Sequence, residues 1–315
     1  MTKVSVLLSI VSAIVLFWYG LEAFSQQIQA ASGKTLTKWL SRLTEKRWLG
    51  LLTGAAAVAI VQSSGAVISL AAALVDAGAM SFRSSLGVLL GANIGTTSTG
   101  FLVSLNLTSV GPFFIVLGAL LSALPTRFKL VGKAAFYFGF VLFSLDVLSI
   151  ALKPLTEGEA LIEQVLRQSS SPLVGVLVGM LVTAVVQSGS ITTGLCILLV
   201  QQDLLAATAA IPIAVGANAG AAVMPVLATA RMSRSAKRVA MANFGFNVFG
   251  VAAFVPFLEP FSRLMVELAG DPGMAVAWAQ LTFNVVMSAG VLFLLRAFGP
   301  RLNAVIDGDG LRQPH

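Results

Sequence analysis

The sequence predicts an all-α polytopic membrane protein that consists of two inverted-topology repeats. The first observation is composition: 57% of the residues are hydrophobic, 10% are charged and the mean hydropathy is +0.91, which excludes an ordinary soluble domain. The second is a set of apolar runs that approach the ~20 residues a helix needs to cross a bilayer. The third is duplication, because Gln62-Ser63 recurs 125 positions later as Gln187-Ser188. Repeated polar interruptions in apolar sequence are typical of secondary transporters.

The apolar runs indicate about seven full spans, with polar or amphipathic stretches at 25–48 and 153–171. The N-terminal run is longer than the apolar core of an ordinary signal peptide, and its end takes part in the repeat, so we expect a mature helix there. The spans are expected near residues 4–24, 83–104, 111–125, 134–152, 208–229, 240–258 and 276–296.

The segments 49–80 and 172–204, which contain the Gln-Ser motifs, can each be interpreted as a single span or as a re-entrant helical hairpin. Single spans would give every repeat an even number of crossings, whereas hairpins would invert the second repeat. The hairpin arrangement places more of the 20 Lys and Arg residues on the cytoplasmic side, as the positive-inside rule requires. We therefore expect two hairpins, with the N-terminus outside and the C-terminus in the cytoplasm.

These elements divide the chain into four parts. Repeat 1 covers residues 1–125, repeat 2 covers 126–258, an additional C-terminal span covers 259–298, and a short cytoplasmic tail covers 299–315. Ahead of each Gln-Ser motif, two glycines four residues apart permit close helix contact. They are Gly50 and Gly54 in the first repeat, and Gly175 and Gly179 in the second.

Several kinds of chemistry are excluded by what the sequence lacks. The only histidine is His315 and the only cysteine is Cys196, so neither a Cys/His metal site nor a Ser-His hydrolase can be assembled. The net charge of +7 fits cytoplasmic loops that face anionic lipid. The basic residues are dispersed among the loops, which argues against nucleic-acid binding. We therefore expect a protein of the lipid bilayer that is not an enzyme and has no cofactor and no nucleic-acid partner. The sequence leaves open whether the protein forms a homodimer.

A second motif, Gly-Ala-Asn, follows each Gln-Ser motif at the same distance and ends in Asn93 and Asn218. A bend at mid-membrane leaves backbone groups that a ligand, water or a neighbour must satisfy. Half-helix N-termini suit an oxyanion and C-termini suit sodium, while hydroxyls and amides can serve either. No obvious titratable residue lies among the motifs, which favours sodium over proton coupling. The candidate substrate- and ion-binding residues are Gln62, Ser63, Ser64, Asn93, Thr96, Thr97, Gln187, Ser188, Ser190, Thr192, Thr193 and Asn218.

Simpler interpretations compete with a binding role. A lone Ser or Thr in a membrane helix usually bonds its own backbone, and Asn often joins two helices. The duplication of both motifs at one spacing favours binding. Asn243 and Asn247 are secondary candidates, because both amides could face the core from an early part of a span.

These residues resemble the motifs of the sodium/phosphate cotransporter type II family, which is found in bacteria and in animal kidney and gut. The matching segments are Val61–Gly65, Leu90–Thr97, Val186–Ser190, Gly216–Gly220 and Phe246–Gly250. The resemblance implies inverted repeats with two hairpins, a bacterial plasma-membrane location, and inorganic phosphate and the coupling ion sodium bound where the Gln-Ser motifs meet. The phosphate or sodium ligands that it implies are Ser63, Ser64, Ser188 and Ser190, with Gln62, Gln187, Asn93 and Asn218 organising the centre. For sodium, the set is Gln62, Ser63, Ser64, Gln187 and Ser188.

The sequence departs from the family pattern mainly in the second repeat. Gly189 interrupts what is commonly a run of serines, and Ala221 and Ala222 stand where threonines are common. Asn243 corresponds to a frequent histidine. These departures remove oxygen ligands. They therefore bear on how many sodium ions are bound and on which substrate is transported.

The function predicted from these residues is sodium-coupled symport of inorganic phosphate by alternating access. Four alternatives stay open: a transporter of the same fold for another oxyanion, a phosphate exporter, a non-transporting membrane sensor or scaffold that binds the anion, and a channel. The sequence leaves the stoichiometry, the electrogenicity and the direction of transport undetermined.

Overall fold

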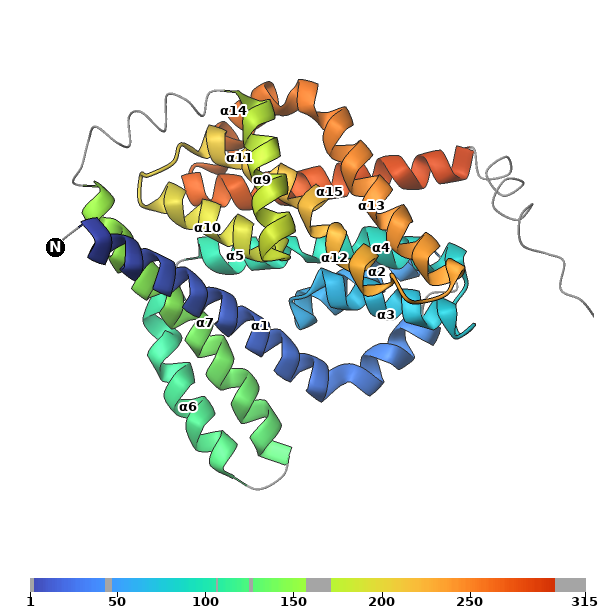
Figure 1. The fold of residues 1–315 in the computed structure, drawn as a ribbon, viewed down its shortest axis with the longest axis horizontal. Coiled ribbons are helices and arrows are strands. Elements are labelled where there is room, and N and C mark those ends of the chain that lie inside the picture. The colour runs from blue at the N-terminus through green and yellow to red at the C-terminus, as the bar shows by residue number, and fades with distance from the viewer. Residues whose placement is uncertain (1–2, 43–46, 106, 125–126, 157–170, 298–315) are drawn as a thin grey trace, which may run out of the picture.

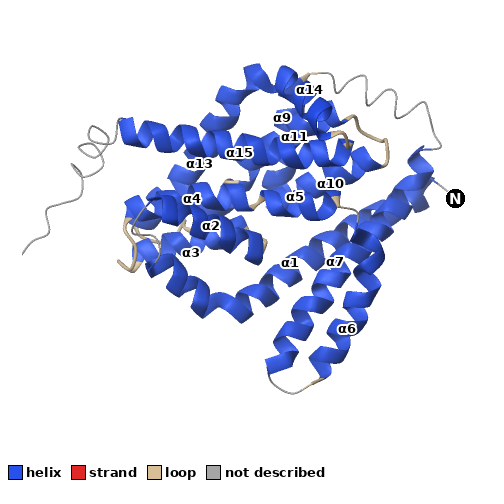
Figure 2. Ribbon diagram, turned by 180° about the vertical axis from the view of Figure 1, so that it is seen from behind, coloured by secondary structure: helices blue, strands red, loops and turns tan. Residues whose placement is uncertain are grey.

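The computed structural model describes residues 3–42, 47–105, 107–124, 127–156 and 171–297. Within these ranges every regular element is helical (Figure 2). The elements are α1 (Lys3–Arg42), α2 (Arg47–Val61), α3 (Ser64–Asp76), α4 (Phe82–Gly95), α5 (Thr97–Ser104), η1 (Leu107–Val110), α6 (Gly111–Ala123), α7 (Arg127–Thr156), α9 (Pro172–Val186), α10 (Gly189–Gln201), α11 (Ala207–Ala221), α12 (Val223–Ala228), α13 (Arg234–Phe254), η2 (Val255–Phe257), α14 (Leu258–Ala269) and α15 (Pro272–Ala297).

Among the described residues, six helices or helix pairs are long and apolar enough to cross a membrane, which confirms a helical membrane protein. They cover residues 4–42, 82–104, 128–155, 207–228, 234–269 and 272–297. The remaining predicted span, 111–125, contains α6, whose 13 residues extend only about 20 Å, less than the ~30 Å of a bilayer core. Helix α6 begins at the predicted residue 111, directly after the 3-10 turn η1, and ends two residues before the predicted end. The predicted tail, 299–315, and most of 153–171 lie outside the described residues.

Helix α1 continues well beyond the predicted span at 4–24. Its 40 residues give a helix of about 60 Å, which curves along one side of the molecule (Figure 1). Its first half packs along α7, and α6 lies against α7, so these three helices form an arm. Its second half buries Leu36 and Leu40 in the apolar cluster around α2 and α3. The stretch expected at 25–48 to be polar or amphipathic is therefore mostly helical and partly packed against the core.

The two halves of the chain repeat one packing arrangement. Helix α2 packs along α4, and α9 packs along α11. A Cβ atom at Gly91 would collide with the carbonyl oxygen of Leu51, and one at Gly216 would collide with that of Val176, 125 positions later in both cases. Glycine is therefore needed where these backbones touch. The same correspondence holds for Gly54 on Val88 and Gly179 on Ile213, and for Gly95 on Ala55 and Gly220 on Met180.

Each long helix that carries a Gly-Ala-Asn motif is interrupted just after it. Helix α4 ends at Gly95 and α5 begins at Thr97, while α11 ends at Ala221 and α12 begins at Val223. The motifs therefore lie at helix ends in the middle of the predicted spans 83–104 and 208–229, where backbone groups become available.

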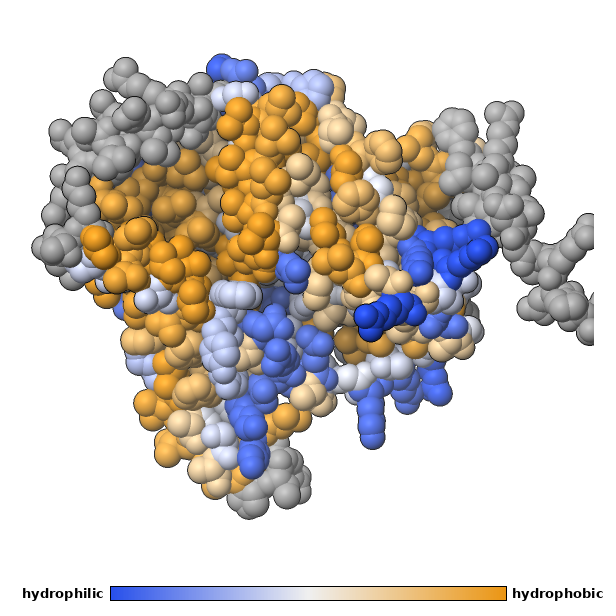
Figure 3. Space-filling model, in the orientation of Figure 1, coloured by the Kyte–Doolittle hydropathy of each residue, from blue (hydrophilic) through white to orange (hydrophobic). Residues whose placement is uncertain are grey.

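The outer surface is apolar where a lipid-facing surface is expected. Helix α9 presents a continuous apolar stripe that includes Leu173, Leu181 and Val185, and Val185 is 83% exposed. This stripe is visible as an orange column over α9 (Figure 3). A patch of this extent on a soluble monomer would be an association surface; in a bilayer it is the ordinary lipid contact.

Candidate functional site

The two Gln-Ser motifs have the same local structure. Gln62 and Gln187 adopt left-handed backbone conformations, with φ of 59° and 60°, which are costly for residues other than glycine. The next residue begins a new helix as its N-cap: the Ser63 and Ser188 hydroxyl oxygens accept hydrogen bonds from the backbone N–H groups of Ala66 at 3.3 Å and Ile191 at 3.4 Å. The motif therefore ends one helix and begins the next within two residues. It leaves the N-terminal N–H groups of α3 and α10 facing the bend.

A central cavity joins residues of both motifs and both repeats. Ser64 follows the first bend, Gly189 follows the second, and Asn93 and Asn218 come from the two Gly-Ala-Asn motifs. The cavity volume is about 10 Å³, roughly what one ordered water requires. The full lining is Ser64, Ile68, Asn93, Thr96, Gly189, Asn218, Ala221, Ala222, Asn243 and Gln280.

The positions that depart from the family pattern are all in this cavity. Gly189, Ala221, Ala222 and Asn243 line it, so the missing oxygen ligands of repeat 2 concern the centre and not a remote surface. A Cβ atom on Gly189 would lie 3.3 Å from the Ala221 side chain, which shows how closely the two apolar replacements approach each other.

In repeat 1 the bend is held by a polar cluster. Gln62 Nε2 donates to Ser98 Oγ at 3.0 Å, and Thr99 Oγ1 lies 2.6 Å from Gln62 Oε1. Thr99 Oγ1 also lies 3.2 Å from Ser190 Oγ, so the cluster connects the first bend, the broken helix α4–α5 and the second hairpin segment. Ser98 and Thr99 were not among the predicted site residues, although they directly follow Thr96 and Thr97.

The equivalent bend of repeat 2 has no such cluster. Gln187 is exposed, and its amide makes no hydrogen bond with the described residues. At the repeat spacing, Ser98 corresponds to Val223 and Thr99 to Met224. Met224 packs over Gly65, 3.3 Å from the place of its missing Cβ. Gly65 corresponds to Ser190 at the repeat spacing. The hydroxyl contact between Thr99 and Ser190 is therefore replaced by an apolar contact between Met224 and Gly65.

A buried amide network occupies the opposite side of the cavity. Gln280 of α15 donates from Nε2 to Thr193 Oγ1 at 2.8 Å, and its Oε1 accepts from Asn218 Nδ2 at 3.2 Å and Asn284 Nδ2 at 2.9 Å. Gln280 and Asn284 are 4% and 2% exposed. Both were missed by the sequence analysis; two amides four residues apart in an apolar run were the available signal.

The remaining predicted residues divide between the cavity and internal bonds. Thr96 lines the cavity and donates to the Ala92 carbonyl at 2.9 Å. Thr97 donates to the Ile94 carbonyl of its own backbone at 2.7 Å, and the Thr192 hydroxyl accepts from the Thr183 hydroxyl of α9 at 2.7 Å. Asn243 is buried in the cavity wall, with Asn247 one turn beyond it.

The electrostatics of the cavity come from dipoles. Its lining contains no Asp, Glu, Lys or Arg, and no group of three or more His, Cys, Asp or Glu side chains gathers among the described residues. Hydroxyls, amides and helix termini are therefore the groups that can contact a ligand there. A neutral site of this kind can accommodate a cation and an oxyanion together without a permanent charge of its own.

A helical membrane protein with two equivalent motif pairs around one polar centre is the class that the fold and site define. The family model described as Na+/Pi-cotransporter matches this chain twice, over residues 16–150 and 151–269. The chain therefore belongs to the Na+/Pi-cotransporter family. Each matched segment contains one Gln-Ser motif and one Gly-Ala-Asn motif.

Curated relatives include bacterial and animal proteins. The chain is 27% identical to "Uncharacterized protein YqeW" of Bacillus subtilis, over 92% of this chain and 94% of that protein. It is 24% identical to "Putative inorganic phosphate export protein YjbB" of Escherichia coli K12 over 89% of this chain, and spans about half (52%) of that relative's length. It is 34% identical to human "Sodium-dependent phosphate transport protein 2B" over 44% of this chain and 23% of the human protein. No solved structure matches the chain.

Proposed function

We propose that the protein is a sodium-coupled symporter of inorganic phosphate that works by alternating access. The observation that carries the proposal is the pair of matched bends: two left-handed Gln residues from different repeats bring the N-termini of α3 and α10 to one neutral cavity. The names of the human and YjbB relatives support phosphate as the substrate. The human name and the family description support sodium as the coupling ion.

The transport site uses the two N-cap serines in this proposal. The oxygens of Ser63 and Ser188 accept from the backbone, and a hydroxyl that accepts still has its own O–H to donate. A phosphate ion at the centre would receive those O–H groups together with free N–H groups of the two helix starts. Sodium would bind to hydroxyl, amide and carbonyl oxygens beside it, drawn from Gln62, Ser64 and their counterparts.

The size of the cavity supports a transport cycle in which the site opens and closes. About 10 Å³ has room for a water-sized group and not for a phosphate ion with four oxygens. The hairpin segments α2–α3 and α9–α10 must therefore separate to admit substrate and close around it. Each of these helices has 13 to 15 residues, too few to cross a bilayer alone, which supports two re-entrant hairpins.

The membrane arrangement is part of the same proposal. Repeat 2 is inverted relative to repeat 1, the N-terminus is outside, and the C-terminus is in the cytoplasm of a bacterial cell. The charge bias of the sequence supports this orientation, because hairpins place most Lys and Arg residues inside. Single cysteines introduced at half-buried Ser41 and exposed Ser109, which lie on opposite sides in this topology, test it by labelling with an impermeant maleimide in intact cells.

Phosphate export is the second candidate function. The name of the YjbB relatives favours it, and the same site can serve either direction, since a transporter runs down the combined gradient of its ligands. The two candidates are separated by the gradients that drive flux, because export driven by another ion would not follow sodium.

The test is uptake of radiolabelled phosphate into liposomes under inward sodium, potassium or proton gradients. We expect saturable, sodium-dependent uptake that Gln62→Ala or Gln187→Ala abolishes without preventing membrane insertion. Gln26→Ala is the matched control, because the Gln26 amide is exposed and contacts only Glu22 one turn away. Normal uptake by either motif variant would overturn the site assignment. Folded protein without phosphate flux under any gradient would indicate another solute or a sensor.

A further inference from the structure

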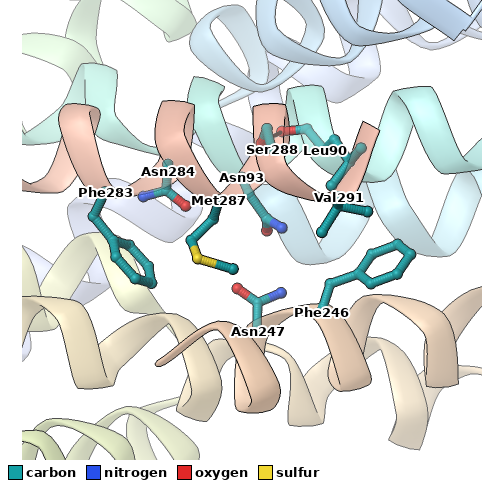
Figure 4. Close-up of a pocket in the computed structure, with 9 residues that line it drawn as sticks. All are labelled: Leu90, Asn93, Phe246, Asn247, Phe283, Asn284, Met287, Ser288 and Val291. Carbon is teal, nitrogen blue, oxygen red and sulfur yellow. Dashed lines mark hydrogen bonds between the residues drawn. The ribbon is translucent and has the colours of Figure 1, made fainter. Parts of the chain in front are cut away.

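A second polar cavity lies beside the central one. Asn93, Asn247, Asn284 and Ser288 line it together with apolar walls that include Phe246 and Phe283 (Figure 4). Its volume is also about 10 Å³. Asn93 lines both cavities, so a ligand in either one would contact the same amide.

Two amide pairs lead from one cavity to the other. Asn243 and Gln280 line the central cavity, and Asn247 and Asn284, each four residues further along α13 and α15, line the second. Four residues are about one helical turn, or roughly 5–6 Å along each axis. The second cavity is therefore a neighbouring position on the same polar path and not a separate surface feature.

The hydrogen bonds orient the amide oxygens toward this space. Asn247 Nδ2 donates to Asn243 O at 2.9 Å and to its Oδ1 at 3.3 Å. Asn284 Nδ2 donates to Gln280 O and Oε1, both at 2.9 Å. The NH2 groups are thus already used, while the Oδ1 atoms accept from no described residue. Both side chains are at least nine-tenths buried, at 5% and 2% exposure. Among the described residues the one fully enclosed side-chain polar atom without a partner is Ser262 Oγ, so these two oxygens border the cavity and are not sealed in protein.

The side chain of Asn93 has no hydrogen bond with the described residues and is half-buried between the two cavities. Figure 4 shows its amide facing that of Asn247, with Asn284 and Met287 alongside. Three amides from three different helices therefore converge on a space of atomic size. In Asn247 and Asn284 the NH2 groups already donate elsewhere, so only the Oδ1 atoms can contact a ligand there.

We propose that this second cavity binds one sodium ion through the side-chain oxygens of Asn93, Asn247 and Asn284. Oxygens without N–H donors suit a cation and repel an oxyanion. The absence of a carboxylate from the lining disfavours a divalent ion, which is held by charged ligands in proteins. The role of this ion in transport rests on the proposed sodium coupling, whereas its binding rests on the amide geometry alone.

Sodium-dependent stability of the purified full-length protein tests the binding. The unfolding temperature is measured without phosphate in mixtures of sodium chloride and choline chloride at constant ionic strength. Ligand binding to the folded state raises this temperature in a saturable way. We expect Asn284→Leu, which keeps the side-chain shape and removes the oxygen, to raise the apparent sodium Kd about tenfold or more, equivalent to the loss of a ligand contact.

Further variants separate a ligand role from a packing role. Asn284→Asp retains the oxygens, so its sodium response persists or strengthens; a packing residue would be as impaired by Asp as by Leu. Gln26→Ala removes an exposed amide outside both cavities and leaves this response in place. Ser144→Ala is the matched control for a buried polar deletion, because that hydroxyl bonds only the Val141 carbonyl of its own helix. Asn247→Leu replaces Asn284→Leu if the latter does not fold.

The inference is overturned if sodium stabilises wild type no more than choline does, or if both Leu variants respond to sodium as wild type does. An equal response to potassium also overturns it as a sodium site. Failure of the proposed function gives a different result. In that case liposomes show no sodium-dependent phosphate flux, but sodium still stabilises the wild-type protein and Asn284→Leu still removes that stabilisation.

Discussion

Thr99 connects the two repeats, and its replacement by valine is the sharpest test of the polar cluster around the first bend. Its hydroxyl lies 2.6 Å from Gln62 Oε1 and 3.2 Å from Ser190 Oγ. One hydroxyl can donate only once at a time, so Thr99 shares its O–H between Gln62 Oε1 and the longer contact to Ser190 Oγ. Thr99→Val keeps the shape of a side chain that is 1% exposed and removes both bonds.

The expected cost follows from the number and burial of these bonds. A hydrogen bond between membrane helices contributes about 0.6 kcal/mol on average and up to about 1.7 kcal/mol. Two such bonds, with Ser190 left buried without this partner, give a loss of about 1–3 kcal/mol. Gln62 still has Ser98 at 3.0 Å, which keeps the estimate below the cost of an isolated buried amide. Because 1.4 kcal/mol is about tenfold in an equilibrium constant, we expect the unfolding equilibrium of Thr99→Val to shift toward the unfolded state by roughly tenfold.

A double-mutant cycle with Gln62→Ala measures the coupling directly. Unfolding in detergent is measured for wild type, both single variants and the double variant, and phosphate uptake in liposomes is measured for wild type and Thr99→Val. We expect a coupling energy of about 0.5–2 kcal/mol. Thr229→Val is the matched control, because that buried hydroxyl bonds carbonyls of its own helix and contacts no motif. Unchanged stability and uptake for Thr99→Val, or strict additivity with Gln62→Ala, would refute the reasoning.

Three other predictions concern packing, the apolar half of the site and the thiol. Gly216→Ala should destabilise the fold by about 1–3 kcal/mol, because the new Cβ meets a backbone carbonyl. Gly290→Ala is the control, because the space around Gly290 is open. Equal melting temperatures of the two variants would contradict the prediction. Met224→Thr combined with Gly65→Ser copies the repeat 1 contact into repeat 2. Uptake by that variant should depend more steeply on sodium. An unaltered sodium dependence would contradict the inference that the apolar residues of repeat 2 weaken sodium binding. Cys196 is 4% exposed, so maleimide should label it far faster after denaturation than in the native protein, as followed by mass spectrometry.

Local sequence was sufficient for the elements whose signals are local. The apolar runs at 83–104 and 208–229 appear as interrupted helices whose ends lie within one residue of those predicted, and the run at 134–152 lies inside the longer helix α7. The segment predicted at 111–125 begins where α6 begins and ends two residues beyond it, but 13 helical residues are too few for the full span that was predicted. The stretch at 25–48 was expected to be polar or amphipathic; helix α1 extends through most of it, and Leu36 and Leu40 pack on α2 and α3, a contact between distant segments.

The sequence by itself determined the membrane class, the duplication and the chemistry available at the centre. Hydropathy and repeated motifs carry that information, because lipid requires apolar helices and makes buried polar groups costly. Only the tertiary structure decided which polar groups meet. Gln62 finds Ser98 and Thr99, whereas Gln187 faces outward, and Gln280 and Asn284 come from α15, outside both motifs. These partners depend on backbone contacts such as Gly91 on Leu51 and Gly216 on Val176, which set where helices cross; no periodicity along the chain encodes that position.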